Sequence, residues 1–415
     1  MKIAIVGSGI AGLTCAYLLN RQHDIQVFEA SDWIGGHTHT VDVQVDGRSY
    51  AIDTGFIVFN DWTYPNFIRL LEQIGVGFKP TEMSFSVSDP ATGVEYNGHD
   101  LNTLFAQRSN LLSPAFWGML RDILRFNRQS LDDLANNRIS ADTTLGQYLD
   151  SNGYGRRFIE HYIVPMGSAI WSMSLADMLG FPLQFFVRFC KNHGLLSVSD
   201  RPTWQVIEGG SRSYVAPLTA SFAERIRLNC PVSRVVRDQD GVTLHSAAGS
   251  ERFDKVIFAC HSDQALALLD QASEKESEIL GALPYANNDV VLHTDTRLLP
   301  KRKLAWASWN YRLGGPSDQP AAVTYDMNIL QGIDSDTTFC VSLNQTAAID
   351  PSKILARFQY AHPQYSLAGT AAQARWEELL GAQHTYYCGA YWANGFHEDG
   401  VVSALRVARA FGETL

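Results

Sequence analysis

The spacing of hydrophobic positions divides the chain into strands and helices. The run KIAIVG at residues 2–7 is apolar and rich in β-branched residues, which is typical of a buried strand. Apolar side chains recur at helical spacing over residues 10–21, and DIQVFE at 24–29 is a second short apolar run. A strand, a helix and a further strand within about 30 residues predict a parallel βαβ unit with a right-handed crossover.

The same patterns predict the later elements. Alternation around turn residues predicts hairpins over 41–52 and 83–97. Residues 101–192 predict a mainly helical block. The remaining predictions are strands over 224–260, at 289–294 and at 339–344, a segment ending in a glycine-containing turn at 384–390, and helices over 351–360 and 400–412. Strands that alternate with helices place the chain in the α/β class.

A glycine-rich turn joins the first strand to the first helix. The sequence GSGIAG at 7–12 allows a tight turn at Gly7, close approach of a phosphate to the backbone at Gly9, and helix–strand packing at Gly12. Glu29 ends the second strand, where a carboxylate can accept a hydrogen bond from a ribose hydroxyl. The alternative is a glycine turn without a ligand. An acid at this position favours FAD or NAD over NADP.

Composition and charge narrow the possible functions. The chain has 415 residues, with 33 Lys and Arg against 43 Asp and Glu and a net charge of −10. This balance argues against nucleic-acid binding, because phosphate backbones require a basic surface. Six scattered cysteines without a CxxC pair predict no zinc site, no disulfides and a cytoplasmic location. No apolar run reaches the roughly 18 residues of a transmembrane helix, and the spaced glycines near the N-terminus argue against a signal peptide.

Several motifs resemble those of the flavin amine oxidase and phytoene desaturase superfamily. They are EASDWIGGH (29–37), DTGF (53–56), EGG (208–210), CPVSRV (230–235), KVIFAC (255–260) and GAYWANGFHEDGVVSAL (389–405). The resemblance implies a Rossmann-like FAD-binding domain of the α/β class with a discontinuous α+β substrate domain. The expected division is 1–75, 200–265 and 384–415 for the FAD-binding domain, and 76–199 and 266–383 for the substrate domain.

The resemblance also implies which residues bind non-covalent FAD. They are Gly7, Gly9, Ile10, Ala11, Gly12, Glu29, Ala30, Gly35, Gly36, His37, Gly55, Phe56, Val232, Gly389, Asp399, Gly400 and Val401. Val232 would back the adenine. Asp399 would accept a hydrogen bond from a ribityl hydroxyl, or would only cap the helix that follows it. The single GxGxxG motif predicts that there is no second domain for NAD(P)H. We therefore expect oxygen, a quinone or a carrier protein to accept the electrons.

The substrate expectation rests on departures from the amine oxidase pattern. The segment NDVVLHTD at 288–295 lacks the lysine usual there, and His397 replaces an aromatic cage residue. GGHTHTV (35–41) and GFHEDG (395–400) resemble a bacterial branch associated with fatty-acyl modification. We therefore expect an FAD-dependent oxidase or desaturase that transfers a hydride from a hydrophobic acyl or isoprenoid-like substrate to flavin N5. The alternatives are an amine oxidase and a non-redox lipid-binding protein that retains the fold.

Four histidines and two amphipathic segments are further candidates. His39 and His397 adjoin the glycine motifs and are the catalytic candidates, whereas His261 and His293 are expected to be structural. Phenylalanines at helical spacing within 181–190 form either ordinary core or an apolar tunnel, and residues 112–125 form either core or a membrane-contacting face at the inner surface of the membrane. No set of residues has the spacing of a metal site.

Overall fold

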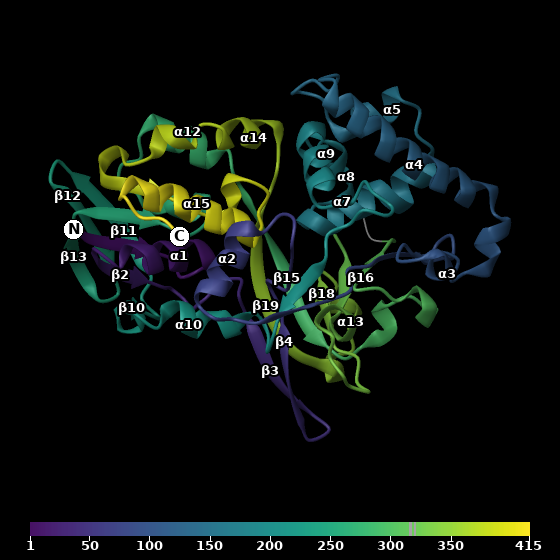
Figure 1. Ribbon diagram of the computed structural model, residues 1–415, viewed down its shortest axis with the longest axis horizontal. Coiled ribbons are helices and arrows are strands. Elements are labelled where there is room, and N and C mark those ends of the chain that lie inside the picture. The colour runs from purple at the N-terminus through teal and green to yellow at the C-terminus, as the bar shows by residue number, and fades with distance from the viewer. Residues whose placement is uncertain (315–317, 319–320) are drawn as a thin grey trace.

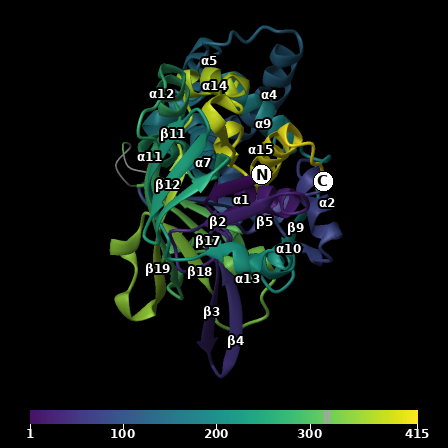
Figure 2. The ribbon, with the colours of Figure 1, turned by 90° about the vertical axis from the view of Figure 1, so that its left-hand side faces the viewer.

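The computed structural model describes residues 1–314, residue 318 and residues 321–415. Figure 1 shows two parts side by side, one built on a parallel sheet that carries both chain termini and one formed by a mixed sheet and a block of helices. The hairpin of β3 (Thr40–Val45) and β4 (Arg48–Asp53) projects from the molecule in Figures 1 and 2.

The parallel sheet collects strands from distant parts of the chain. Its order is β10 (Ile226–Arg227), β2 (Asp24–Phe28), β1 (Lys2–Val6), β14 (Lys255–Phe258) and β20 (Thr385–Tyr387), and every pair is parallel. Helices α1 (Ile10–Leu19) and α15 (His397–Ala410) pack against each other beside it. Because all five strands point the same way, the loops that follow them meet at one edge of the sheet.

The mixed sheet has seven strands. They are, in spatial order, β19 (Ile354–Pro363), β15 (Tyr285–His293), β18 (Cys340–Leu343), β17 (Val323–Asp326), β16 (Trp309–Arg312), β7 (Phe85–Asp89) and β8 (Val94–Asn97). Two three-stranded antiparallel sheets are formed by β11 (Val232–Asp238), β12 (Gly241–Ser246) and β13 (Gly249–Phe253), and by β5 (Val58–Asn60), β9 (Trp204–Ile207) and β6 (Phe78–Pro80).

Most remaining helices belong to the helical block or to the sheet margins. The block contains α3 (Leu101–Leu104), α4 (Pro114–Ala135), α5 (Leu145–Ser151), α6 (Arg156–Phe158), α7 (Val164–Trp171), α8 (Leu175–Leu179) and α9 (Leu183–Asn192). The others are α2 (Pro65–Gln73), α10 (Val215–Thr219), α11 (Ser262–Leu268), α12 (Glu274–Gly281), α13 (Met327–Gln331) and α14 (Leu367–Gln373). Within the described residues, no helix combines the length and apolarity needed to cross a bilayer.

The predicted βαβ unit, both hairpins, the helical block and the final helix are present. The helix predicted over 351–360 is wrong, because β19 occupies this segment and pairs with β15 along its length. Leu355, Arg357 and Gln359 are exposed, whereas the residues between them are covered, so the segment has the period of a strand.

The phenylalanines within and just before α9 form core and not a tunnel. Phe181 and Phe186 are fully buried, and Phe189 is nearly so. The ring of Trp171 on α7 lies 4.4 Å from that of Phe181 and 4.8 Å from that of Phe189, so the cluster closes around the indole.

Candidate functional site

One large cavity lies at the edge of the parallel sheet where the strands end. Its volume is about 870 Å³, and its walls come from the loops after β1, β2 and β14, the start of α15, and the strands β15 and β19. The two parts of the molecule meet at this cavity. This placement agrees with the rule that ligands of open parallel sheets bind beyond the carboxyl ends of the strands.

The glycines after β1 have different structural roles. A Cβ on Gly7 would lie 2.8 Å from the carbonyl oxygen of Ala259, and one on Gly12 would lie 2.0 Å from the carbonyl oxygen of Gly7. A Cβ on Gly9 would contact nothing within 4 Å, and Gly9 lines the cavity. Gly36 packs on it from the opposite side, where an added Cβ would lie 3.2 Å from the Cα of Gly9. The first two glycines therefore allow packing, and Gly9 leaves backbone accessible at the start of α1.

Glu29 is partly occupied by bonds within the protein. Its Oε2 atom accepts hydrogen bonds from the backbone N–H of Ser8 at 2.9 Å and from the Ser8 hydroxyl at 2.6 Å, and its Oε1 atom accepts one from the N–H of Ser31. Glu29 still lines the cavity, as do Ala30 and Val232. The carboxylate thus fixes the glycine turn and faces the same space.

Three histidines from distant segments converge beside the glycine turn. The ring of His37 lies 6.1 Å from that of His261 and 5.6 Å from that of His362. Burial, with a smaller effect from a neighbouring imidazole, lowers the pKa of His37 to about 4, of His261 to about 4 and of His362 to about 3. All three are therefore neutral at pH 7. The Nε2 atom of His37 is buried without a hydrogen-bond partner in the described part of the chain.

The two catalytic candidates differ in their relation to the cavity. His397 lines it, stacks on Phe56 with the rings 3.4 Å apart, and has its Nε2 atom 3.0 Å from the hydroxyl of Thr38. Burial lowers its pKa well below the usual value. His39 does not line the cavity: its Nδ1 atom lies 2.7 Å from the hydroxyl of Tyr360, which does. The structure therefore brings only His397 to the cavity wall.

Asp399, Gly400 and Val401 in the last motif support the cavity wall from behind. Asp399 accepts hydrogen bonds from the backbone N–H groups of Phe396 at 2.9 Å and Asn394 at 3.1 Å, which caps α15, and burial raises its pKa to about 6. A Cβ on Gly400 would lie 2.8 Å from Ile10, and Val401 is fully buried. Asp399, Gly400, Val401 and Gly12 are the four expected cofactor residues that do not line the cavity, and the other thirteen do.

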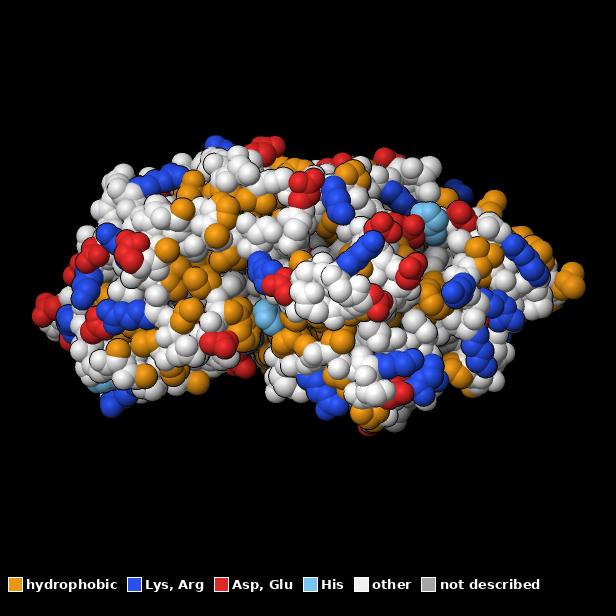
Figure 3. Space-filling view, turned by 90° about the horizontal axis from the view of Figure 1, so that it is seen from below, with side chains coloured by type: hydrophobic (Ala, Val, Ile, Leu, Met, Phe, Trp, Pro, Cys, Tyr) orange, Lys and Arg blue, Asp and Glu red, His pale blue; other side chains and the backbone are white. Residues whose placement is uncertain are grey.

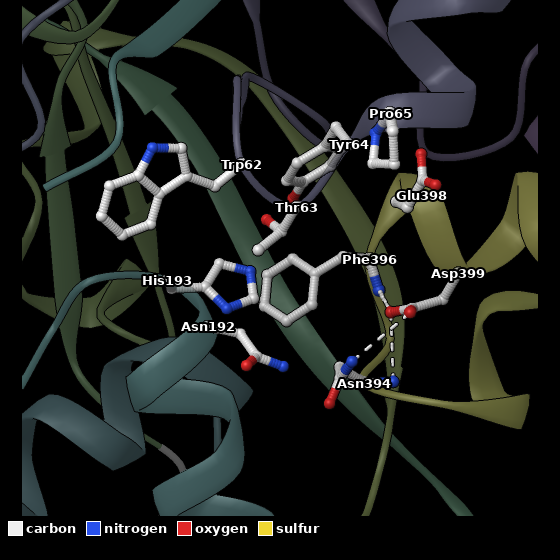
Figure 4. Close-up of a pocket in the computed structure, with 10 residues that line it drawn as sticks. All are labelled: Trp62, Thr63, Tyr64, Pro65, Asn192, His193, Asn394, Phe396, Glu398 and Asp399. Atoms are coloured by element: carbon white, nitrogen blue, oxygen red, sulfur yellow. Dashed lines mark hydrogen bonds between the residues drawn. The ribbon is translucent and has the colours of Figure 1, made fainter.

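A smaller cavity of about 380 Å³ adjoins the large one (Figure 4). Phe396 and Asn394 line both cavities. In Figure 4 the Phe396 ring stands beside His193, with Trp62 on the far side and the Asp399 carboxylate turned toward Asn394. Phe396 thus forms part of the wall between the cavities.

The end of the large cavity away from the glycine turn is apolar and aromatic. Its walls include Ile57, Ile170, Trp171, Trp309, Tyr325, Leu330, Tyr360, Tyr365 and Phe396. Among the described residues that line the cavity there is no Lys, Arg or Asp, and Glu29 is the only carboxylate. Apart from Glu29, the cavity is therefore uncharged at neutral pH.

The sequence motifs did not identify several residues that line the large cavity. His261, expected to be structural, lines the cavity and stacks on Tyr285. His362 and Tyr360 lie on β19, in and beside the segment predicted to be helical. The alternation along β19 was the available signal. His293, in contrast, is fully buried and hydrogen-bonded, as expected of a structural histidine.

Comparison with known proteins identifies the family. The model of the family described as "Flavin containing amine oxidoreductase" matches residues 10–328. The chain belongs to this family. The protein is accordingly an FAD-dependent oxidoreductase, and FAD is its cofactor.

Individual relatives in this family carry different names. The monoamine oxidase AofH of Mycobacterium tuberculosis is 23% identical over 350 residues, 79% of this chain and 71% of that protein. Zeta-carotene desaturase of Solanum lycopersicum is 37% identical over 76 residues, only 18% of this chain and 12% of that protein. The structure of a fatty acid isomerase from P. acnes has a TM-score of 0.69 at 16% identity, covering 99% of this chain and 98% of that one. Likeness at this level of identity shows the shared fold.

The cavity fits FAD at its glycine-rich end. An open cradle lies above Gly9, at the start of the ten-residue helix α1, which has no side-chain cap. Gly36 packs closely on Gly9, and a side chain added at Gly9 would fill the cradle. Backbone N–H groups and the positive end of a helix dipole suit a pyrophosphate. The residues present are therefore compatible with the cofactor of the family.

Proposed function

We propose that this enzyme oxidises a neutral, hydrophobic substrate of acyl or isoprenoid type. The observation that supports this proposal is the uncharged, aromatic end of the large cavity, which offers no carboxylate to an ammonium group. A charged amine would lose its hydration there without a compensating partner, which is costly. The names of the carotene desaturases and the fatty acid isomerase agree with substrates of this kind.

We also propose the discontinuous domain division 1–75, 200–265 and 384–415 against 76–199 and 266–383. All five strands of the parallel sheet fall in the first set, and all seven strands of the mixed sheet fall in the second. This separation supports a Rossmann-like FAD-binding domain and a substrate domain, with the cavity at their boundary.

The cavity-lining residues of the glycine motifs would hold FAD, with Gly9 and the start of α1 at the pyrophosphate and Val232 beside the adenine. When bound, FAD supplies the acceptor for a hydride equivalent from the substrate. His397 is fixed by Thr38 and Tyr214 and stays neutral, so it can orient groups through hydrogen bonds without adding charge. The aromatic walls exclude water and align an apolar chain. Oxygen, a quinone or a carrier protein remains the expected electron acceptor.

We expect FAD binding to be coupled to a partial uptake of protons that grows as the pH falls toward 5. The lining offers no Lys or Arg to a dianionic pyrophosphate, so His37, His261 and His362 are the groups that can acquire positive charge. Their pKa values of about 3 to 4 in the free protein rise beside an anion, so the bound state holds more protons and affinity falls as pH increases.

Isothermal titration of the apoprotein in two buffers of different ionisation enthalpy measures this uptake. His261→Gln is expected to reduce it, whereas His245→Gln on the surface strand β12 is the matched control. A buffer-independent enthalpy at pH 5 together with an unchanged Kd from pH 5 to 7 would show that the histidines stay neutral on binding.

A matched pair of ligands tests the substrate class. Decan-1-ol and decylamine have the same chain, and perturbation of the flavin spectrum reports their binding to the holoenzyme. We expect the alcohol to bind at least about tenfold more tightly at pH 7, since a buried unpaired charge costs well over 1.4 kcal/mol.

Asn287→Asp adds a carboxylate to the cavity wall and is expected to narrow this difference, whereas Gln239→Glu in a surface turn is expected to leave it unchanged. Tighter binding of the amine to the unmodified enzyme would instead favour an amine substrate. Strong binding of the alcohol without any substrate that reduces the flavin would favour the lipid-binding alternative.

A further inference from the structure

The surface of the helical block exposes an unusual number of large apolar side chains. Leu112 is 88% exposed, Leu124 58%, Trp117 50% and Leu111 47%. All four lie within fourteen consecutive residues, in the 3-10 turn Arg108–Leu112 and in α4. Isolated exposed leucines are common, but a concentration of this kind marks an interaction surface.

The four residues form a connected surface at one end of the block. The indole N–H of Trp117 donates a hydrogen bond to the carbonyl oxygen of Leu111 at 2.9 Å, which ties the 3-10 turn to α4. Leu124 follows Trp117 by seven residues, two helical turns along the same side. We call Leu111, Leu112, Trp117 and Leu124 the apolar face of α4.

The opposite side of α4 packs into the protein. Phe116, Met119 and Phe126 are almost fully buried in the core of the helical block. Packing in the core therefore explains the apolar residues on one side of this helix. It does not explain those of the apolar face.

Arginines accompany the apolar face. Arg121 and Arg128 alternate with Trp117 and Leu124 at spacings of three and four, so all four project from one side of the helix. Arg108 is exposed in the adjoining turn. In the part of the chain that the structure describes, none of these three arginines forms a salt bridge, although the chain as a whole has a net charge of −10.

The segment that carries the face has few acidic groups, and Asp132 and Asp133, which follow it in α4, pair with Arg138. Between residues 101 and 131 the only carboxylate is Asp122, which is buried, accepts a hydrogen bond from the N–H of Gly155 and lies 3.3 Å from Arg125. Figure 3 shows apolar and basic side chains together at the end of the molecule that carries α3 and α4. The face is therefore locally basic on an acidic protein.

We propose that the apolar face of α4, with Arg108, Arg121 and Arg128, docks the protein on an anionic lipid bilayer. Apolar side chains reach the acyl boundary while neighbouring arginines meet lipid phosphates, and tryptophan favours this interface. The charge pattern orients the molecule, because the rest of its surface is repelled by the same lipids. The inference does not depend on which substrate the enzyme oxidises.

Vesicle sedimentation of the FAD-loaded protein tests this docking. Vesicles of phosphatidylcholine with about one third phosphatidylglycerol are compared with vesicles of phosphatidylcholine alone. We expect at least tenfold tighter binding to the anionic vesicles, weakening as salt is raised. Leu112→Glu and Trp117→Glu are each expected to reduce binding at least tenfold.

Leu355→Glu is the matched control, because Leu355 is an exposed leucine on β19 outside this face. Unchanged flavin content and thermal midpoint show that each variant is folded. Equal binding by Leu112→Glu, Trp117→Glu and the unmodified protein would overturn the proposal, as would failure of the unmodified protein to sediment with anionic vesicles. A dimer that Trp117→Glu dissociates, without vesicle binding, would assign the face to a second copy of the chain and also overturn it.

Discussion

Gly9→Val is expected to give a folded protein that binds FAD at least about 100-fold more weakly, since several charge-assisted hydrogen bonds are lost together. The backbone of Gly9, with φ −68° and ψ 176°, suits any residue, and its added Cβ contacts nothing within 4 Å. The new side chain would fill the open space where a phosphate approaches the start of α1. Fluorescence titration of the apoprotein with FAD measures the loss.

Gly118→Val in α4 provides the control, because a Cβ there also contacts nothing within 4 Å. It is expected to leave FAD affinity unchanged. If Gly9→Val retained the affinity of the unmodified protein with an unaltered thermal midpoint, the glycine turn after β1 would not be the phosphate cradle.

Trp171→Ala is expected to lower the free energy of unfolding by about 3–5 kcal/mol. Trp171 is 4% exposed and fills the space between the cavity and the phenylalanines of α9. Removing the indole leaves a void, because the closely packed side chains around it cannot move far enough to fill the space. It also opens the cavity toward that cluster, so longer apolar chains should gain affinity relative to short ones.

Denaturant unfolding of the holoenzyme measures the stability change, and Trp117→Ala serves as the comparison. Trp117 is half exposed, so its loss is expected to cost no more than about 1 kcal/mol. Equal losses in the free energy of unfolding for the two variants would mean that Trp171 does not stabilise the cavity wall more than an ordinary surface residue does.

Local features of the site were predictable from the sequence, because neighbouring residues determine them. The glycines of 7–12 need only a strand before them and a helix after them, and both are present. The second glycine motif, at Gly35 and Gly36, is also recognisable on its own, and Gly35 pairs with Gly9 in an isolated bridge. These features depend on backbone geometry, which short motifs specify well.

The assembly of the cavity walls from distant segments was not predictable in the same way. His261, His362 and Trp171 come from the loop after β14, from β19 and from α7, and only the packing of the two sheets brings them together. For β19 the error came from assigning a helical period to alternating positions, so Tyr360 and His362 were not recognised as candidates for the site. The phenylalanines near α9 had the helical spacing that was predicted. The residues against which they pack depend on the tertiary structure and could not be read from that spacing.

The uncharged cavity links the family to the proposed substrate. Membership of an amine oxidoreductase family supplies the fold and the cofactor, whereas the chemistry of the lining residues bears on specificity. Neutral histidines and aromatic walls favour a neutral molecule in this chain. A carboxylate near the aromatic end of the cavity would instead have favoured an amine substrate.

Anaerobic reduction of the bound flavin tests the central claim most directly. The oxidised holoenzyme is mixed without oxygen with a bacterial phospholipid extract and, separately, with a panel of amines, and the visible flavin absorbance is followed. We expect loss of absorbance with the lipid extract and none with the amines. Bleaching by amines alone, or by neither while dithionite still reduces the flavin, would contradict the assignment of a neutral hydrophobic substrate.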